Sequence, residues 1–461
     1  MKSTTARRVL CVSAPTVAIA LVVTACSGST SPNTSPSFDP NAKVTITLSN
    51  QPPATQAADL AAYKKVIADF EKEYPNITVK GVETGWDPQT FQAQLAGGQL
   101  PTIMGVPFTE PQGLIARKQV ADITSELDEV GLKDKLNPAA VQVAEDKAGH
   151  IYGVPADAYA LGLGYNRKIF EEAGLDPDKP PTTWDEMRAD AKIIADKTGK
   201  TGYAQMTTGG QGGWTLTAMT YSAGGTVLNA SGSKVTFTNK PKAMQEQLEL
   251  LQKMRWTDNS MGNNFTYDQN AILKDFAAGK IGMVITAPIG YAFTTELFGM
   301  NGKDFGLGSM PQGAEKGGSL SGGALLTVMP NATPAQRLAA VKFMAFRLRT
   351  YTDKDTAVAA AKAANAAGTP VGLPGLSILK TSDQNRYLGW IKDYINVPLS
   401  NFDPYMKTIN TIALRPEPAK NAQEIYATLD PVVQAVLTKK GTDIPSTLDS
   451  AKSTIEGLLA R

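Results

Sequence analysis

Strand-like and helix-like segments alternate through the first part of the body of this chain, and that alternation limits the folds it can adopt. Residues 43–48 and 77–82 alternate apolar and polar side chains, and residues 102–106 form a short apolar run. Residues 57–74 place apolar side chains at helical spacing, and residues 88–97 suit a helix that two glycines end. This order predicts a parallel sheet with right-handed crossovers and helices on both faces.

The second half of the chain is richer in helix, with strands interleaved. Thr183 and Glu186 have the spacing of a capping box, and Gly199 is placed to end the helix that they open. Residues 149–166 predict two strands bridged by residues 155–157. Further helices are expected at 241–256, 267–278, 334–350, 381–394, 421–438 and 445–459, and strands at 281–286, 305–309 and 324–328.

The residue inventory removes much of enzyme chemistry. The 461 residues include one histidine, His150, and two cysteines, Cys11 and Cys26. Zinc or iron sites built on several His and Cys are therefore excluded, and a Ser-His-Asp triad could use only His150. Both cysteines lie near the N-terminus, which excludes a disulfide framework. Because 45 basic residues nearly balance 43 acidic ones, a nucleic-acid-binding protein is not expected either.

The N-terminus has the pattern of an export signal followed by a lipid anchor. Residues 1–8 carry three positive charges, and an apolar run of marginal spanning length follows them. Residues 23–26, Val-Thr-Ala-Cys, resemble a bacterial lipobox, so we expect residues 1–25 to be removed and Cys26 to carry palmitate-type acyl chains. Residues 26–42 then form the lipidated cysteine and a flexible Ser/Thr/Pro/Asn-rich tether. An ordinary signal peptide with an incidental cysteine is the alternative.

Ligand contacts are expected in the loops that follow strands, because open α/β sheets bind ligands beyond the carboxyl ends of their strands. Those loops are 49–54, 106–110, 156–160, 208–215, 286–291 and 319–323. They are largely uncharged and contain Gly-rich turns, in which backbone amides can approach a ligand closely. They offer Asn50, Gln51, Thr109, Glu110, Asp157, Tyr159, Trp214, Tyr291, Gly322 and Gly323.

Several segments together resemble the extracellular solute-binding proteins of ABC importers, in the family 1 group that includes maltose-binding proteins. They are residues 69–79 (DFEKEYPNITV), 95–101 (LAGGQLP), 151–157 (IYGVPAD), 164–175 (GYNRKIFEEAGL), 181–186 (PTTWDE) and 276–283 (FAAGKIGM). Each segment is a weak signal alone, but their order and spacing are specific. The resemblance covers about residues 43–440.

The resemblance implies an α/β fold of the two-lobe periplasmic-binding-protein type, class II. Each lobe would be a mainly parallel sheet flanked by helices, with the ligand cleft between the lobes. Lobe 1 would comprise residues 43–163 and 309–349, and lobe 2 residues 164–308 and 350–461. Such proteins close on a ligand by bending at a hinge and are then recognised by a membrane permease.

The resemblance also implies roles for particular residues. It places Asn50, Gln51, Thr109 and Glu110 near the ligand, Tyr159 at a position that often contacts sugar, and Trp214 at a common stacking position. Tyr291 follows Ile289, which stands where the family often has Trp, so the aromatic platform is expected at Tyr291. Arg415 is a further candidate contact.

A carbohydrate is the ligand that this residue set favours. Aromatic rings match the apolar C–H face of a sugar, and Asn, Gln, Asp, Glu and Arg match its hydroxyl edge. A glycerophosphodiester or another small polar solute is the alternative, although the candidate loops hold few cations. A glycoside-acting enzyme would need two positioned carboxylates, and no motif places them. We therefore expect a monomeric binding protein outside the cell, attached to the bacterial cell membrane by lipid alone, with neither cofactor nor metal and with an ABC permease as partner.

Overall fold

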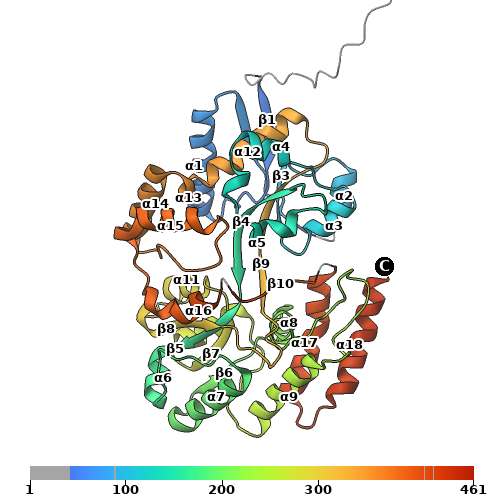
Figure 1. Cartoon of the computed structure of the whole chain (residues 1–461), viewed down its shortest axis with the longest axis vertical. Helices are drawn as coiled ribbons and strands as arrows, with labels where there is room; N and C mark the ends of the chain where they lie inside the picture. The colour runs from blue at the N-terminus through green and yellow to red at the C-terminus, as the bar shows by residue number, and fades with distance from the viewer. Residues whose placement is uncertain (1–41, 88–89, 410, 419, 461) are drawn as a thin grey trace, which may run out of the picture. The chain divides into compact units, whose positions relative to one another are not determined.

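The computed structural model describes residues 42–87, 90–409, 411–418 and 420–460. The expected signal peptide, Cys26 and most of the tether lie outside these residues. Two sheets, each with its own hydrophobic cores, define the two parts that we call lobe 1 and lobe 2 (Figure 1). No helix in the described part of the chain is long and apolar enough to cross a membrane.

The lobe 1 sheet begins with the predicted parallel strands. Strand β1 (Val44–Leu48) lies between β2 (Ile77–Gly81) and β3 (Ile103–Pro107) and is parallel to both. Strand β9 (Ser319–Val328) pairs antiparallel with β3 and with β4 (Gly153–Ala160). The short strand β10 (Leu414–Pro416) joins the first residues of β9 in parallel.

Helices cover both faces of the lobe 1 sheet. Leu325 and Leu326 are neighbours in β9 but belong to different hydrophobic clusters, because successive strand residues point to opposite faces. Phe70 and Phe343 contribute to the Leu326 cluster, and Phe91 to the Leu325 cluster. The helices are α1 (Ala57–Glu73), α2 (Phe91–Ala96), α3 (Pro111–Ala116), α4 (Thr124–Glu129), α5 (Pro138–Val141) and α12 (Pro334–Arg347).

The lobe 2 sheet differs from the expectation of a mainly parallel sheet. Its order is β6 (Thr201–Tyr203), β7 (Ile281–Thr286), β5 (Gly162–Asn166) and β8 (Phe305–Ser309). Only β6 and β7 are parallel, whereas β5 is antiparallel to both β7 and β8. The physical reason is connectivity: β5 leads the chain into lobe 2 and β8 leads it back out, so the two must run in opposite directions.

The helices of lobe 2 follow the sequence pattern closely. The predicted capping box at Thr183 and Glu186 is present, and Gly199 ends that helix in the left-handed conformation. The helices are α6 (Arg167–Ala173), α7 (Trp184–Thr198), α8 (Gln211–Ser222), α9 (Ala243–Trp256), α10 (Gln269–Ala277), α11 (Gly290–Ala292), α16 (Asp403–Ile409), α17 (Ala422–Thr438) and α18 (Ile444–Leu459). Short 3₁₀ or π turns occupy Lys133–Lys135, Gln142–Ala144, Phe293–Leu297, Gly302–Asp304, Lys392–Tyr394 and Leu399–Phe402.

Strands β4 and β9 connect the two lobes (Figure 1). Strand β4 continues through residues 155–157, where a bulge replaces the break that the sequence suggested. At the crossing point the Leu161 amide donates to the Leu320 carbonyl at 2.9 Å, and the Ser319 hydroxyl donates to the Leu161 carbonyl at 2.7 Å. The crossover is therefore tied by hydrogen bonds on both strands.

The division between the lobes differs from the expected one after residue 349. Helices α13 (Arg349–Thr352), α14 (Lys354–Ala366) and α15 (Thr381–Ile391) follow α12 directly. Ile378 and Leu379 are buried in the core of lobe 1, and Leu379 forms a bridge with Leu136 there. The Lys380 amide also donates to the Lys135 carbonyl at 2.8 Å. These contacts place residues 350–391 with lobe 1 rather than with lobe 2.

Candidate functional site

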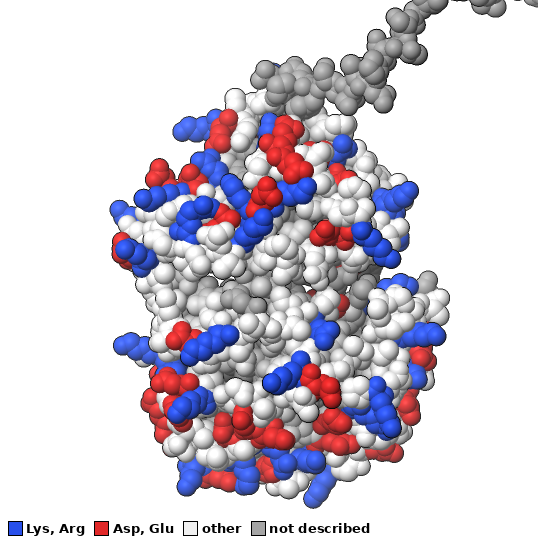
Figure 2. All heavy atoms as spheres, viewed as in Figure 1, with Lys and Arg blue, Asp and Glu red and all other residues white. Residues whose placement is uncertain are grey.

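A cavity of about 440 Å³ lies where the two lobes meet. Lobe 1 contributes Phe108 and Gln142 to its lining, and Ile412 and Leu414 come from the segment that packs against lobe 2. The space-filling view shows charged side chains of both signs over each lobe and few of them in the band between the lobes (Figure 2). A ligand entering this region therefore meets mainly uncharged surface.

Tyr159 lies on β4 beside the junction of the lobes. Two predicted site residues, Gly322 and Gly323, leave space for the aromatic side chains there. Tyr159 pairs with Gly322 in the ladder, and a Cβ added at Gly322 would clash with the Tyr159 phenol. A Cβ at Gly323 would approach the Phe108 ring to 2.9 Å. Gly322 and Gly323 thus allow aromatic side chains to lie directly over β9.

Trp214 lies in the first turn of α8, which opens after Gly209 and Gly210 in the left-handed conformation. No side chain at the N-cap accepts a hydrogen bond from this helix. Asp430, on α17, does so instead, accepting from the Gly210 amide at 2.7 Å and from the Gly213 amide at 2.9 Å. The Trp214 and Tyr159 rings meet edge to face, with centroids 6.4 Å apart and an interplanar angle of 81°. Asp430 therefore holds the turn that positions Trp214.

Glu417 follows β10 and lies against these aromatic side chains. It accepts a hydrogen bond from the Tyr426 hydroxyl at 3.1 Å and another from the Trp214 side chain. Burial among protein atoms raises the pKa of Glu417 to about 7, the two hydrogen bonds oppose that rise, and the charge of Glu110 adds to it.

Glu110 begins α3 in lobe 1 and brings a second carboxylate towards Glu417. The Thr109 hydroxyl donates to Glu110 at 3.1 Å. Burial raises the pKa of Glu110, and the negative charge of Glu424 contributes to the rise. The charge of Glu110 thus acts on Glu417, and Glu417 in turn has Tyr159 and Trp214 as neighbours. We call these four residues the Glu417 cluster.

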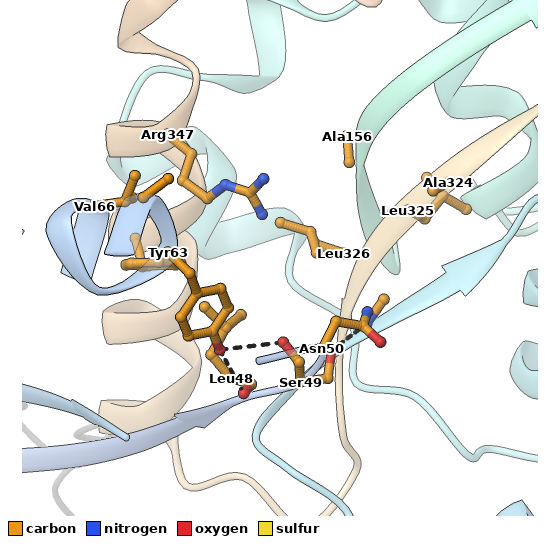
Figure 3. Close-up of a pocket in the computed structure, with 13 residues that line it drawn as sticks. Leu48, Ser49, Asn50, Tyr63, Val66, Ala156, Ala324, Leu325, Leu326 and Arg347 are labelled. Atoms are coloured by element: carbon orange, nitrogen blue, oxygen red, sulfur yellow. Dashed lines mark hydrogen bonds between the residues drawn. The ribbon is translucent and has the colours of Figure 1, made fainter. Parts of the chain in front are cut away.

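A second cavity, of about 380 Å³, lies in lobe 1 between the ends of β1 and α12. Figure 3 shows the Arg347 guanidinium pointing into it, with Ser49, Asn50 and Tyr63 on one side and Ala156 and Leu326 on the other. We call this cavity the Arg347 pocket. Its lining is Leu48, Ser49, Asn50, Ala62, Tyr63, Val66, Gly105, Ala156, Ala324, Leu325, Leu326, Phe343 and Arg347.

The Arg347 pocket is built closely around Asn50. This residue has a φ of 60°, a left-handed conformation that Asn tolerates better than most residues. A Cβ at Gly105 would lie 2.7 Å from Asn50 Nδ2, so the strand glycine makes space for the amide. The Tyr63 hydroxyl donates to the Leu48 carbonyl at 2.9 Å and approaches the Ser49 carbonyl at 3.2 Å. Burial raises the Tyr63 pKa to about 12, an effect that the Arg347 charge partly offsets.

Asp157 and Tyr351 connect the two regions. Asp157 is exposed, and its carboxylate accepts from the Ala324 amide at 3.1 Å; desolvation nevertheless raises its pKa. Tyr351 has both Asp157 and Arg347 as electrostatic neighbours, and Tyr159 has both Asp157 and Glu417. Asp157 is therefore an electrostatic neighbour of one tyrosine near the Arg347 pocket and of one tyrosine in the Glu417 cluster.

Three of the predicted residues lie apart from these groups. Gln51 is half-buried, with its amide oxygen beside Gly81. Tyr291 is buried, and its ring packs against Phe305 and Phe402 in the core of lobe 2. Arg415 is exposed and donates to the Gly317 carbonyl at 2.6 Å.

Sequence reasoning missed Glu417, Tyr63, Arg347 and Tyr351. Glu417 stands between Pro416 and Pro418, two residues after Arg415, and this short Arg-Pro-Glu-Pro segment is typical of a constrained loop. The other three lie on helices, where polar side chains usually face solvent, so no pattern separates them from ordinary surface residues.

Residues 54–349 match the sequence profile of the family described as bacterial extracellular solute-binding protein, which is more than half of the chain. The chain belongs to this family. Among curated relatives of this solute-binding protein, the sn-glycerol-3-phosphate-binding periplasmic protein UgpB of Pectobacterium atrosepticum is 27% identical over 299 residues. UgpB of Escherichia coli K12 is 25% identical over 297 residues. The matched regions cover 60% of this chain in both cases, and 64% and 65% of the two relatives, which is less than two thirds of their length.

Solved structures confirm the two-lobe α/β fold of this solute-binding protein. The cyclic alpha-maltosyl-1,6-maltose binding protein from Arthrobacter globiformis superposes with a TM-score of 0.67 at 22% identity, covering 90% of this chain and 98% of that one. UgpB from Mycobacterium tuberculosis, solved in complex with glycerophosphocholine, has a TM-score of 0.67 at 17% identity, with the same coverage of both chains.

Proposed function

We propose that this protein captures a hydroxylated, carbohydrate-type solute between its lobes and delivers it to the membrane subunits of an ABC importer. The observation that carries the proposal is the Glu417 cluster, in which the Tyr159 and Trp214 rings meet edge to face beside Glu417 and Glu110 of lobe 1 is the second carboxylate. An aromatic ring packs on the C–H face of a sugar, and a carboxylate accepts hydrogen bonds from neighbouring hydroxyls. Asn50, Thr109 and Asp157 add polar contacts from lobe 1 in this proposal.

Closure follows from the placement of these groups on both lobes. Glu110 belongs to lobe 1, whereas Trp214 belongs to lobe 2. A ligand that contacts both gains its full set of interactions only in a closed state, so binding shifts the population towards closure. We infer that the permease recognises this closed state.

A glycerophosphodiester is the second candidate ligand. Two relatives are named as sn-glycerol-3-phosphate-binding proteins, and one structural neighbour was solved with glycerophosphocholine. Carboxylates in the Glu417 cluster would repel a phosphate placed against them, which favours a neutral group there.

A thermal-shift screen tests the proposal. Purified protein is heated with mono-, di- and oligosaccharides and with glycerophosphodiesters. A ligand at 100 times its Kd stabilises the folded state by about 2.7 kcal/mol, so the true ligand class raises the Tm. Failure of every hydroxylated compound to raise the Tm would contradict the proposal. Incubation with labelled oligosaccharides tests the non-enzymatic role, because turnover without a partner would indicate an enzyme.

We further propose that lipid on Cys26 holds the protein at the outer face of the cell membrane and that it acts as a monomer. Substitution Cys26→Ala should release the protein from the membrane or block its processing. Membrane fractionation measures this outcome, and retention of a cleaved Cys26→Ala form would contradict the anchor.

A further inference from the structure

We propose that the Arg347 pocket seats an anionic substituent, a carboxylate or a phosphate, of the captured solute. The inference rests on the proposed function and narrows its substrate class to hydroxylated compounds that carry one acidic group. The anion would lie against the Arg347 guanidinium in lobe 1, and the neutral hydroxylated part would extend towards the Glu417 cluster.

Arg347 differs from the other arginines in having no protein partner. Among the nine arginines in the described residues, it alone has neither an ion pair nor a hydrogen bond. The partners of the others are Gln119 for Arg117, Asp178 for Arg167, Asp258 for Arg188, the Leu437 carbonyl for Arg255, Glu126 for Arg337, Glu73 for Arg349, Asp383 for Arg386 and the Gly317 carbonyl for Arg415.

The acidic side chains on neighbouring helical turns already form ion pairs with other basic residues. Asp69 pairs with Lys65 at 2.6 Å, and Glu73 pairs with Arg349. Asp157 is an electrostatic neighbour of Tyr351, whereas the groups that act on Arg347 are Tyr63 and Tyr351. Within the described chain, no carboxylate is therefore in ion-pair contact with the guanidinium.

The wall opposite the guanidinium offers it no polar partner. The opposite wall consists of small and aliphatic side chains, including Ala156, Ala324 and Leu326 (Figure 3). Removal of water by the surrounding protein lowers the pKa of Arg347, although its side chain stays open to solvent on the pocket side. An anion entering the pocket would form charge-assisted hydrogen bonds in a setting where water competes less.

Two further donors face the same cavity. The Ser49 Oγ accepts from the Gly105 amide at 2.9 Å, which leaves its own proton to donate. The Asn50 side chain has no hydrogen bond within the described residues and lies over Gly105, where its Nδ2 is free to donate. The Tyr63 hydroxyl, in contrast, already donates to backbone carbonyls. The donor set is thus Arg347, Asn50 and Ser49, which is suited to an anion with several acceptor oxygens.

The size and position of the pocket limit what it holds. A volume of about 380 Å³ is near the lower end for ligand sites. It suits one acidic unit rather than a whole oligosaccharide. Glu110 and Glu417 lie outside the lining of this pocket and offer no cation, so the acidic end of a ligand would be seated at Arg347.

The test compares matched neutral and acidic compounds by isothermal titration on the full-length protein. The pairs are glucose and glucuronate, cellobiose and cellobiouronate, and glycerol and glycerol 3-phosphate. We expect the acidic member of at least one pair to bind at least 10-fold more tightly than its neutral partner. The cellobiouronate and glycerol 3-phosphate arms distinguish a carboxylate from a phosphate as the anion.

Substitution of the arginine assigns the effect to the pocket. Arg347→Gln should weaken the acidic ligand at least 10-fold and leave neutral ligands within twofold, and Arg347→Lys should restore part of the loss. Arg349→Gln, two residues away and outside the pocket lining, is the matched control and should change neither affinity. Without ligand, Arg347→Met should leave the Tm unchanged or raise it, because Arg347 has no protein partner.

The outcomes separate this inference from the proposed function. If only neutral saccharides bind, or if Arg347→Gln weakens neutral and acidic ligands alike, the inference is wrong while the binding function stands. A marked drop in the Tm of ligand-free Arg347→Met would also overturn it, because it would show a structural role. If no compound of any pair binds, the proposed function itself fails.

Discussion

The Glu417 cluster and the Arg347 pocket differ in the charge and the type of their side chains. The first combines carboxylates with aromatic rings and draws on both lobes, whereas the second places one unpartnered guanidinium among aliphatic side chains of lobe 1. The carboxylates of the cluster are held with raised pKa values, but the cation of the pocket is left for a ligand. The difference suggests that one end of the site selects hydroxyl groups and the other selects charge.

Removal of the indole should give the largest effect and should act on every ligand. Trp214→Ala deletes the ring that packs against Tyr159 and donates to Glu417. We expect a loss of about 1–3 kcal/mol in binding, or about 5- to 150-fold in Kd, for neutral and acidic ligands alike. Isothermal titration measures it.

Trp390→Ala, on α15 in lobe 1, is the matched control for Trp214→Ala and should leave the affinity unchanged. Unchanged affinity in Trp214→Ala itself would make that side chain a packing residue, and the cluster would then no longer represent the hydroxyl-selecting end.

Loss of the cap on α8 should come next. Asp430→Ala leaves the Gly210 and Gly213 amides without their acceptor, and the turn that positions Trp214 loosens. Loss of a helix cap costs about 1–2 kcal/mol, so the free energy of unfolding should fall by about that amount in a urea titration. The matched control is Asp443→Ala, because Asp443 caps α18, away from Trp214. Both variants should be less stable, but only Asp430→Ala should also bind the ligand more weakly. An equal loss of affinity in the two variants would show that the cap does not act through Trp214.

These two residues illustrate how far sequence alone could reach. Trp214 was predicted because it lies in an expected ligand loop and because the family resemblance places a stacking aromatic there. Asp430 was not, because its partners are more than 200 residues away and only the packing of α17 on α8 brings them together. Tyr291 shows the reverse case: its loop position was predicted correctly, but its ring turns into the lobe 2 core with Phe305 and Phe402.

The fold shows the same division between local and long-range information. Capping boxes, glycine stops and a first-turn proline are local signals, and they predicted α7 and α12 to within a few residues, whereas α8 and α14 were not expected. The direction of β5 relative to β7 and β8, and the packing of residues 350–391 on lobe 1, depend on how the chain crosses between lobes. Neither leaves a pattern in the sequence, which is why both expectations were wrong.

A small change in the floor of the Arg347 pocket should affect only acidic ligands. In Gly105→Ala the new Cβ would lie 2.7 Å from Asn50 Nδ2 and would push the amide aside. Loss of one charge-assisted hydrogen bond is worth about 1 kcal/mol, so acidic ligands should bind about 5-fold more weakly. Gly389→Ala, on α15, meets nothing within contact distance and is the control for glycine replacement. An equal loss for neutral ligands would show that the pocket does not discriminate by charge.

A last effect concerns the proton on Glu417 and does not involve the ligand. Its pKa is about 7 in the folded protein and about 4.3 in an unfolded chain, so between these values the folded state holds more protons. The free energy of unfolding should therefore fall as the pH rises from about 4.5 to 7, and this contribution should level off above 7. Thermal unfolding of the wild type and of Glu417→Gln is measured at each pH. The difference between the two proteins gives the contribution of Glu417, because all other titratable groups are present in both. Glu424→Gln, on the exposed surface, should follow the wild-type curve. A wild-type minus Glu417→Gln difference that stayed level across pH 4.5–7 would mean that Glu417 is ionised throughout, and the cluster would then repel anions even at low pH.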